Sequence, residues 1–301
     1  MKTLLVKGPA LSRSGYGEQT RFALRALRNH EDKYNLLLLN IPWWHTGWIN
    51  QDDEEVTWLL HLMAKAENHI RHKAQIDISL QSTIPNEWES IAPINIGYTA
   101  GIETTRVSPA WIEKASMMDK IIVVSNHSKN VFEQTSYKVT NNETNKEFIM
   151  KNATPIEVVN YPVRTLEQQP FDLDLDYDFN FVTVAQMGPR KNMDNTIKWF
   201  IEEFHDDEVG LVLKTNMANC STMDRFACTE RLQESLKQFP DRKCKIYLLH
   251  GDLTLEEMNY LYAHPKVKSY ITLTHGEGFG IPIFEAAYHG VPVIAPNWSG
   301  Q

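Results

Sequence analysis

The sequence predicts an α/β protein with two domains, each built on a doubly wound parallel sheet. Short β-rich runs alternate with longer segments of helical period, which is the pattern of parallel strands joined by crossover helices. A polar, acidic stretch interrupts this alternation once, and the alternation then starts again. The chain has 301 residues, which is enough for two domains with separate cores.

The first domain is expected to span residues 1–163. We expect strands at 4–7, 36–39, 76–80, 94–98, 121–124 and 156–159, and helices at 18–28, 53–72, 109–115 and 129–134. The helix over 53–72 has a clear start, because Asp52 and Glu55 are spaced as a capping box. Residues 138–153 are polar and rich in Asn, without an apolar period, so they are expected to form a surface loop.

The composition changes over residues 164–178, which carry two Gln, Pro170 and alternating Asp. This segment is expected to connect the domains. A calcium loop would need Gly in place of Tyr177 and Glu in place of Thr183, so a solvated acidic linker is expected instead. The second domain then covers 179–301, with strands at 179–185, 211–215, 245–249, 270–273 and 291–295 and helices at 192–204, 225–239, 255–262 and from Pro282 onward.

Composition and charge argue against several classes of protein. Apolar residues make up 42% and charged residues 23% of the chain, as in soluble globular proteins. The net charge of -8 disfavours nucleic acid as a partner, because such binding depends on clustered Lys and Arg. The apolar run 36–39 is too short to span a bilayer, so no transmembrane segment is expected. Residues 1–7 are typical of a strand and not of a secretory signal, and a cytoplasmic location is therefore expected.

Neither a hydrolytic triad nor a metal centre is expected. The 11 His residues fall into no Ser/His/Asp or metal-ligand pattern. Cys220, Cys228 and Cys244 lack the paired spacing of zinc or redox sites and are expected to be buried free thiols.

An aromatic cluster follows the second expected strand. It consists of Trp43, Trp44 and Trp48, with His45 among them. Sugar faces stack on indole rings, so an acceptor platform is one interpretation, and ordinary packing is the other.

Residues 275–290, HGEGFGIPIFEAAYHG, are the most informative stretch. Gly278 and Gly280 permit a tight turn close to a ligand, Pro282 suits the first helical position, and Gly290 suits the residue past the helix end. A strand, a glycine loop and a helix start are thereby joined. Unpaired amide groups and the helix dipole at such a junction favour a diphosphate.

Two acids belong to this stretch. Glu277 lies in the loop, and Glu285 lies one turn into the helix on the side of the loop. Carboxylates accept hydrogen bonds from sugar hydroxyls, so each acid can serve one of two hydroxyl-bearing rings beside the diphosphate. Acids early in a helix also complement its dipole, and spacing alone leaves both interpretations open.

The segment GEGFGIPIFEAAYHGVPVIAPNWSG resembles the signature of glycosyltransferase family four (group 1), in which two Glu separated by seven residues mark the donor site. The resemblance implies that Glu277 contacts the donor sugar and that Glu285 contacts the ribose hydroxyls. The loop residues implied to bind the donor are Gly278, Phe279, Gly280 and Ile281.

A second segment, VAQMGPRKNMDNTIKWFIEEF, resembles the strand, basic loop and helix of the same family. Lys191 falls at the family lysine that neutralises the diphosphate, and Arg190 precedes it. Gln186 replaces an Arg that often follows the strand, and the sequence leaves open whether Arg190 or Lys214 supplies the missing charge. Ordinary solvent-facing charges before a helix remain the other interpretation of the two basic residues.

The segment GYTAGIETTRVSPAWIEKASMMDKIIVVSNHSKNVF resembles the first domain of this family. It implies that Glu103 lies in the interdomain cleft near the donor sugar, although a surface-loop acid fits equally well. His127 follows a strand that ends at Ser125, where open parallel sheets place ligand contacts. Helix capping is the expected role of Ser125.

Two glycine-bearing turns complete the expected donor site. Gly15, Tyr16 and Gly17 lie between a strand and a helix, and the family has a similar loop that faces the diphosphate, but the full dinucleotide fingerprint is absent. Gly251 and Asp252 resemble the family position beside the nucleobase.

The resemblance implies a GT-B enzyme with two Rossmann-like domains and its active site in the cleft between them. Such a hexosyltransferase-like enzyme moves a sugar from a nucleotide-sugar donor to an acceptor, with retention of configuration and without a metal or other cofactor. The donor, the acceptor (glycan, lipid or small molecule) and oligomerisation stay open. A hydrolase or epimerase of the same fold and a nucleotide-sugar-binding protein without turnover are the alternatives. Because the chain stops at Gln301, after the segment that resembles the donor loop, we expect a truncated second domain.

Overall fold

The computed structural model divides into two compact units. It describes residues 1–43, 46–49, 52–140, 145–164 and 167–301. Unit 1 comprises Met1–Pro162 with Glu277–Phe279 and Gly300, and unit 2 comprises Val163–Gly276, Gly280–Ser299 and Gln301. Within these described ranges, no helix has the length and apolar character needed to cross a membrane.

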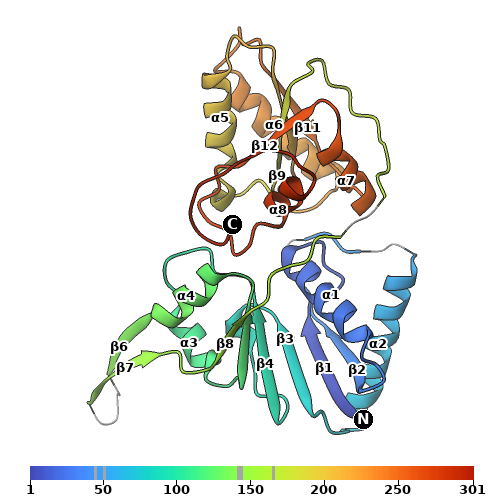
Figure 1. Ribbon diagram of the computed structural model, residues 1–301, viewed down its shortest axis with the longest axis vertical. Coiled ribbons are helices and arrows are strands. Elements are labelled where there is room, and N and C mark those ends of the chain that lie inside the picture. The colour runs from blue at the N-terminus through green and yellow to red at the C-terminus, as the bar shows by residue number, and fades with distance from the viewer. Residues whose placement is uncertain (44–45, 50–51, 141–144, 165–166) are drawn as a thin grey trace. The chain divides into compact units, whose positions relative to one another are not determined.

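Six parallel strands form the sheet of unit 1, in the order β2-β1-β3-β4-β5-β8 (Figure 1). The strands are β1 (Lys2–Gly8), β2 (Tyr34–Asn40), β3 (Ile78–Ser82), β4 (Ile94–Thr99), β5 (Lys120–Val123) and β8 (Ile156–Val158). The strand order reverses between β1 and β3, which makes this pair the topological switch point of the sheet. Leu36, Leu37 and Leu38 of β2 are all buried, as expected for a strand covered on both faces.

Side chains cap most helices of unit 1, at Ser14, Asp53 and Ser125, whereas the N-cap residue Ser108 makes no such hydrogen bond. The helices are α1 (Gly15–Arg28), α2 (Glu54–Arg71), α3 (Pro109–Ala115) and α4 (Asn126–Gln134), with a 3-10 turn at Pro85–Glu87. The capping box predicted at residue 52 is wrong, because Asp53 is the N-cap residue of α2 and accepts from Val56 N at 2.8 Å. Glu55 instead accepts from Arg25 on α1, with Nη2 to Oε2 at 2.7 Å.

The segment predicted as a surface loop after α4 contains a β-hairpin instead. Strands β6 (Ser136–Thr140) and β7 (Glu147–Lys151) pair antiparallel. Tyr137 lies opposite Met150 and Val139 opposite Phe148, so one face of the hairpin is apolar. Tyr137 and Met150 pack on the core of the unit. Each strand contributes only two residues to this apolar face. An apolar pattern that short does not predict a hairpin within an Asn-rich sequence.

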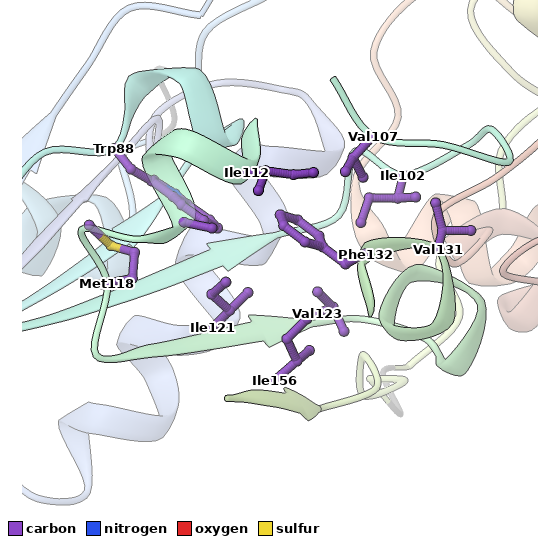
Figure 2. Close-up of a cluster of buried hydrophobic side chains, with 11 residues drawn as sticks. Trp88, Ile102, Val107, Ile112, Met118, Ile121, Val123, Val131, Phe132 and Ile156 are labelled. Atoms are coloured by element: carbon purple, nitrogen blue, oxygen red, sulfur yellow. The ribbon is translucent and has the colours of Figure 1, made fainter. Parts of the chain in front are cut away.

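A buried apolar cluster fills the space between α3, α4 and the β4–β5–β8 side of the sheet (Figure 2). Trp88 and Phe132 are its largest members, and both are fully buried. Gly97 on β4 lies against the indole ring, since a Cβ there would come within 2.5 Å of Trp88 Cζ2. Ile102, in the loop after β4, and Val123, at the end of β5, belong to this cluster, which therefore holds the segments that lead to Glu103 and His127.

Unit 2 contains a five-stranded parallel sheet in the order β11-β10-β9-β12-β13. The strands are β9 (Asn180–Val184), β10 (Gly210–Lys214), β11 (Lys245–Leu249), β12 (Val267–Ile271) and β13 (Val293–Ile294). The helices are α5 (Met193–Glu203), α6 (Thr222–Leu236), α7 (Leu255–Ala263) and α8 (Ile281–Tyr288), with a 3-10 turn at Pro189–Lys191. The strand order reverses between β9 and β12.

Successive residues of the central strands face opposite helix layers in unit 2. Phe181 and Leu211 belong to one buried cluster, with residues of α5 and α6. Val182 and Val212 belong to a second cluster, with residues of α7 and α8. The sheet is therefore covered on both faces, and the predicted α/β class with doubly wound parallel sheets is confirmed.

The acidic stretch before β9 is not a fully solvated linker. Leu175 is 3% exposed and joins the core beneath α7 and α8, with Phe171 and Leu173 packed against the same cluster. The alternating Asp residues face outward. Asp176 accepts from Tyr247 Oη at 2.9 Å, and Lys245 and Tyr247 hold its pKa below the usual range. The alternation of acids and apolar side chains thus indicates an extended segment with one packed face.

Part of the aromatic cluster after β2 can be placed. Trp44 and His45 lie outside the described residues. The Trp43 ring packs on Tyr16 with 4.7 Å between centroids, while Trp48 is 52% exposed. Packing therefore accounts for Trp43.

Candidate functional site

The strand order of unit 2 places two sequence motifs side by side at one edge of the sheet. The basic turn at 186–192 follows β9, and the glycine loop at 272–280 follows β12. Because β9 and β12 are parallel neighbours at the switch point, both segments leave the same edge of the sheet. Open α/β sheets bind ligands at this position.

Arg190 connects the two segments. Its Nη1 donates to the carbonyl oxygen of Gly276 at 2.8 Å. Its own carbonyl accepts from the amide of His275 at 2.9 Å and from Thr274 Oγ1 at 3.2 Å. Asn192 adds a further bond, from Nδ2 to the Leu273 carbonyl at 3.0 Å. The guanidinium predicted to face a diphosphate thus also braces the backbone just before Glu277.

Lys191 and Gln186 lie on the same turn after β9. Lys191 is half-buried and ends the 3-10 turn, and Asn192 follows in the left-handed region with φ 54°. Gln186, which stands where a cation was expected, donates from Nε2 to the Met217 carbonyl at 2.8 Å. A neutral amide therefore links this turn to the loop after β10.

Helix α8 starts at a glycine that adopts a conformation open mainly to glycine. Gly280 is the N-cap residue, with φ 88° and ψ 57°. It has no side-chain oxygen, so it cannot cap the first amide groups of α8 as Ser or Asp would. Pro282 is the second helical residue and not the first, and Gly290, with φ 75°, follows the C-cap residue His289. This geometry suits an anion at the helix start.

The two predicted donor-site acids differ in burial. Glu277 is 7% exposed, and its carbonyl accepts from the amide of Gly300 at 2.7 Å. Glu285 is half-buried on α8, and its Oε2 accepts from the buried hydroxyl of Tyr262 at 3.2 Å. No sequence pattern pointed to Tyr262, because a Tyr within an amphipathic helix usually indicates core packing.

Lys214 and Gly251, from neighbouring strand ends, are in direct contact. Lys214 Nζ donates to the Gly251 carbonyl at 2.6 Å, and Gly251 has φ 121°. Asp252 follows and is exposed. The charge of Lys214 is therefore held at the predicted nucleobase turn, in contact with its backbone.

A buried carboxylate, missed by the sequence reasoning, organises the loop after β10. Asp224 on α6 accepts from the amides of Met217, Ala218 and Asn219 at 2.9, 2.7 and 3.0 Å. It also accepts from His250 Nε2 at 2.8 Å. Burial alone would raise the pKa of Asp224, but the bonds from Asn219, His250 and Met217 outweigh it and hold the pKa well below the usual range.

Cys228 completes a grouping of metal-ligand type with Asp224 and His250, whose ligand atoms lie within 4.8 Å of one another. Its Sγ lies 3.5 Å from Asp224 Oδ1, and burial with the adjacent negative charge raises its pKa to about 11. The hydrogen bonds to Asp224 account for this grouping without a metal. All three cysteines are free, and Cys228 and Cys244 are buried as predicted, whereas Cys220 is half-buried.

In unit 1, the loop after β1 is held close to the start of α1. Ser14 caps the helix and accepts from Gly17 N at 3.1 Å. A Cβ on Gly17 would lie 2.0 Å from the Ser12 carbonyl oxygen, whereas nothing lies within 4 Å of one on Gly15. Gly17 is therefore required by close backbone packing, and Gly15 is not.

Tyr16 ties this loop to the end of β4. Its hydroxyl is 2.7 Å from Thr99 Oγ1 and accepts from the Ala100 amide at 3.3 Å. Burial raises the pKa of Tyr16 to about 12. The phenol is thus a neutral structural group that links the loop after β1 to the end of β4.

His127 and Glu103 are brought together through one loop. Glu103 is half-buried after β4, and His127 Nε2 donates to the carbonyl of neighbouring Thr104 at 3.2 Å. Ser125 caps α4 and accepts from Ser128 N at 3.2 Å, which confirms its predicted capping role.

Comparison with known proteins rests on structure. No protein-family profile matches the sequence, and no curated protein matches it either. Among solved structures, the lipopolysaccharide outer core galactosyltransferase WaaB in its apo form matches with a TM-score of 0.57 and 12% identity, over 98% of this chain and 80% of that chain. Anabaena HepE in complex with UDP and glucose matches with a TM-score of 0.57 and 15% identity, over 100% of this chain and 82% of that one.

A trehalose-6-phosphate synthase, described in a study of glycosyltransfer with retention, matches with a TM-score of 0.55 and 9% identity, over 100% of this chain and 85% of that chain. At these identities the likeness shows the fold. The chain has the two-sheet, Rossmann-like α/β fold of GT-B glycosyltransferases.

Proposed function

We propose that this protein is a glycosyltransferase that uses a nucleotide-sugar donor. The proposal rests on the arrangement of two loops at the switch point of unit 2. There the turn that bears Lys191 is bonded, through Arg190, to the loop that opens α8 at Gly280. Cationic side chains and uncapped helix amides at one sheet edge are suited to a diphosphate leaving group.

The roles proposed for the side chains follow from this placement and from the family resemblance. Lys191 and the start of α8 stabilise the charge that develops on the departing diphosphate, and Arg190 fixes the loop while adding positive charge. Glu277 orients the donor sugar, and Glu285 binds the ribose. Glu103 is proposed to act near the sugar.

Retention of configuration and a reaction without metal or other cofactor are part of the proposal. The resemblance to glycosyltransferase family four supports both, and retention is also named for the structurally similar trehalose-6-phosphate synthase. The acceptor is proposed to be a glycan, a lipid or a small molecule.

The test is donor binding followed by turnover. Sugars linked to UDP, ADP and GDP are screened by thermal shift and calorimetry, and release of the free nucleoside diphosphate is then followed with an acceptor panel. Lys191→Ala is expected to lower turnover by about 100-fold. Lys198→Ala, an exposed lysine on α5, serves as the matched control and is expected to be neutral.

Other outcomes identify the alternatives. Sugar release without an acceptor would indicate a hydrolase, and an altered sugar still attached to its nucleotide would indicate an epimerase. Donor binding without any release of nucleoside diphosphate would indicate a binding protein. Equal loss of turnover in the two lysine variants would contradict the role of Lys191.

A further inference from the structure

The hydroxyl of Tyr262 is a buried polar group on the core side of α7. Tyr262 is 1% exposed and belongs to the cluster that also contains Ala286 and Val291. Its ring lies 5.7 Å from the His289 ring and 6.4 Å from the Tyr270 ring. Packing on several sides leaves the ring little freedom to change its orientation.

The hydroxyl reaches the carboxylate predicted to bind ribose. Tyr262 Oη donates to Glu285 Oε2 at 3.2 Å. Burial, and then the charge of Glu285, raise the pKa of Tyr262 well above its usual value, so the phenol stays protonated and remains a donor. A phenylalanine would fill the same apolar space, so the hydroxyl contributes mainly through this contact.

The backbone of Glu285 is held by a second ring. His289 Nδ1 donates to the Glu285 carbonyl at 2.8 Å, and the same imidazole ring packs beside Tyr262. The main chain and the side chain of Glu285 are thus each restrained by a packed aromatic residue. A carboxylate that is ordered before binding loses less conformational entropy when the ligand arrives.

We propose that Tyr262 is a positioning residue that orients the Glu285 carboxylate toward the vicinal hydroxyls of a ribonucleotide donor. The inference rests on the proposed function, in which Glu285 binds the ribose. It makes Tyr262 a determinant of selectivity for ribonucleotides, because its effect passes through hydroxyls that a dideoxynucleotide lacks.

The test compares two probes on matched variants. The nucleoside diphosphate among UDP, ADP and GDP that binds the wild type most tightly is titrated by calorimetry, alongside its 2′,3′-dideoxy counterpart. Tyr262→Phe is expected to weaken binding of the ribonucleotide by about 3- to 10-fold and to leave dideoxynucleotide binding unchanged. Tyr260→Phe is the control, because Tyr260 lies on the same helix and packs on Phe171 and His264.

Steady-state kinetics and a double-mutant cycle add readouts that a structural role would not reproduce. Tyr262→Phe is expected to raise KM for the donor more than it lowers kcat. The effect of Tyr262→Phe should vanish in a Glu285→Gln background. Tyr262→Met, which also fills the space without a hydroxyl, replaces Tyr262→Phe if that variant does not fold.

Each contrary result has a separate meaning. Equal weakening of both probes, or no change in either, overturns the role of Tyr262 while the proposed function stands. An unchanged effect of Tyr262→Phe in the Glu285→Gln background also overturns it. Failure of every nucleoside diphosphate to bind the wild type overturns the proposed function, and this inference with it.

Discussion

The guanidinium of Arg190 donates to the carbonyl oxygen of Gly276 at 2.8 Å and so joins the turn after β9 to the loop after β12. The planar guanidinium group holds its N–H donors in a fixed arrangement, and this geometry matters here as well as the positive charge. A lysine would carry the same charge on a single flexible ammonium group. Arg190 is thus both a cation and a brace for the backbone that leads to Glu277.

Replacement of Arg190 by Lys separates these two contributions. We expect Arg190→Lys to lower the free energy of unfolding by about 1–2 kcal/mol and to weaken binding of the preferred nucleoside diphosphate by about tenfold, because the brace is lost while the charge remains. Denaturant titration and calorimetry measure the two effects. Arg225→Lys, at an exposed position on α6, is the control. Full activity of Arg190→Lys would show that charge alone is required.

A side chain at Gly280 should disturb the start of α8. Alanine at φ 88° is strained, so Gly280→Ala is expected to lower the free energy of unfolding by about 1–2 kcal/mol and to weaken nucleoside diphosphate binding. Gly188→Ala is the control, because its backbone is extended and nothing lies within 4 Å of the added Cβ. Denaturation and calorimetry are compared for both. Equal effects of the two substitutions would contradict the importance of the helix start.

Gly17 and Gly15 should respond in opposite ways to the same substitution. Gly17→Ala places a Cβ 2.0 Å from the Ser12 carbonyl oxygen and is expected to destabilise unit 1 by about 2–3 kcal/mol. Gly15→Ala meets open space and is expected to stabilise it by about 0.5–1 kcal/mol, since alanine loses less entropy than glycine in a helix. The denaturant midpoints of the two variants and the wild type provide the measurement. An unchanged midpoint for Gly17→Ala would argue against close packing of this loop.

The Asp224 carboxylate makes stability depend on pH in a defined direction. Its pKa in the folded protein lies below the unfolded value, so its contribution is present above about pH 4 and is lost as the pH falls through the folded pKa. Asp224→Asn is expected to lower the free energy of unfolding by about 2–3 kcal/mol at pH 7, with a gap to the wild type that narrows toward pH 3. Urea titrations across this range, with exposed Asp178→Asn as the control, provide the measurement. A gap that stays constant with pH would contradict an ionised buried carboxylate.

The predicted order of helices and strands was largely correct, because it follows from local periodicity. Helix α3 (Pro109–Ala115) and strand β11 (Lys245–Leu249) have the predicted bounds. The hairpin of β6 and β7 was missed, because its pairing depends on Tyr137 and Met150 reaching the core. Likewise, Asp53 and not Asp52 caps α2, a difference of one residue that side-chain geometry decides.

Local patterns in the sequence were enough to predict the α/β class and the glycine junction before α8 with the acids around it, since a glycine loop between a strand and a helix is itself a local pattern. Three contacts exist only because the chain folds: Arg190 with Gly276, Tyr262 with Glu285, and Asp224 with His250. Each of these contacts joins segments whose proximity depends on strand order, and strand order depends on which elements pack together. The periodicity of a single segment carries no information about that packing.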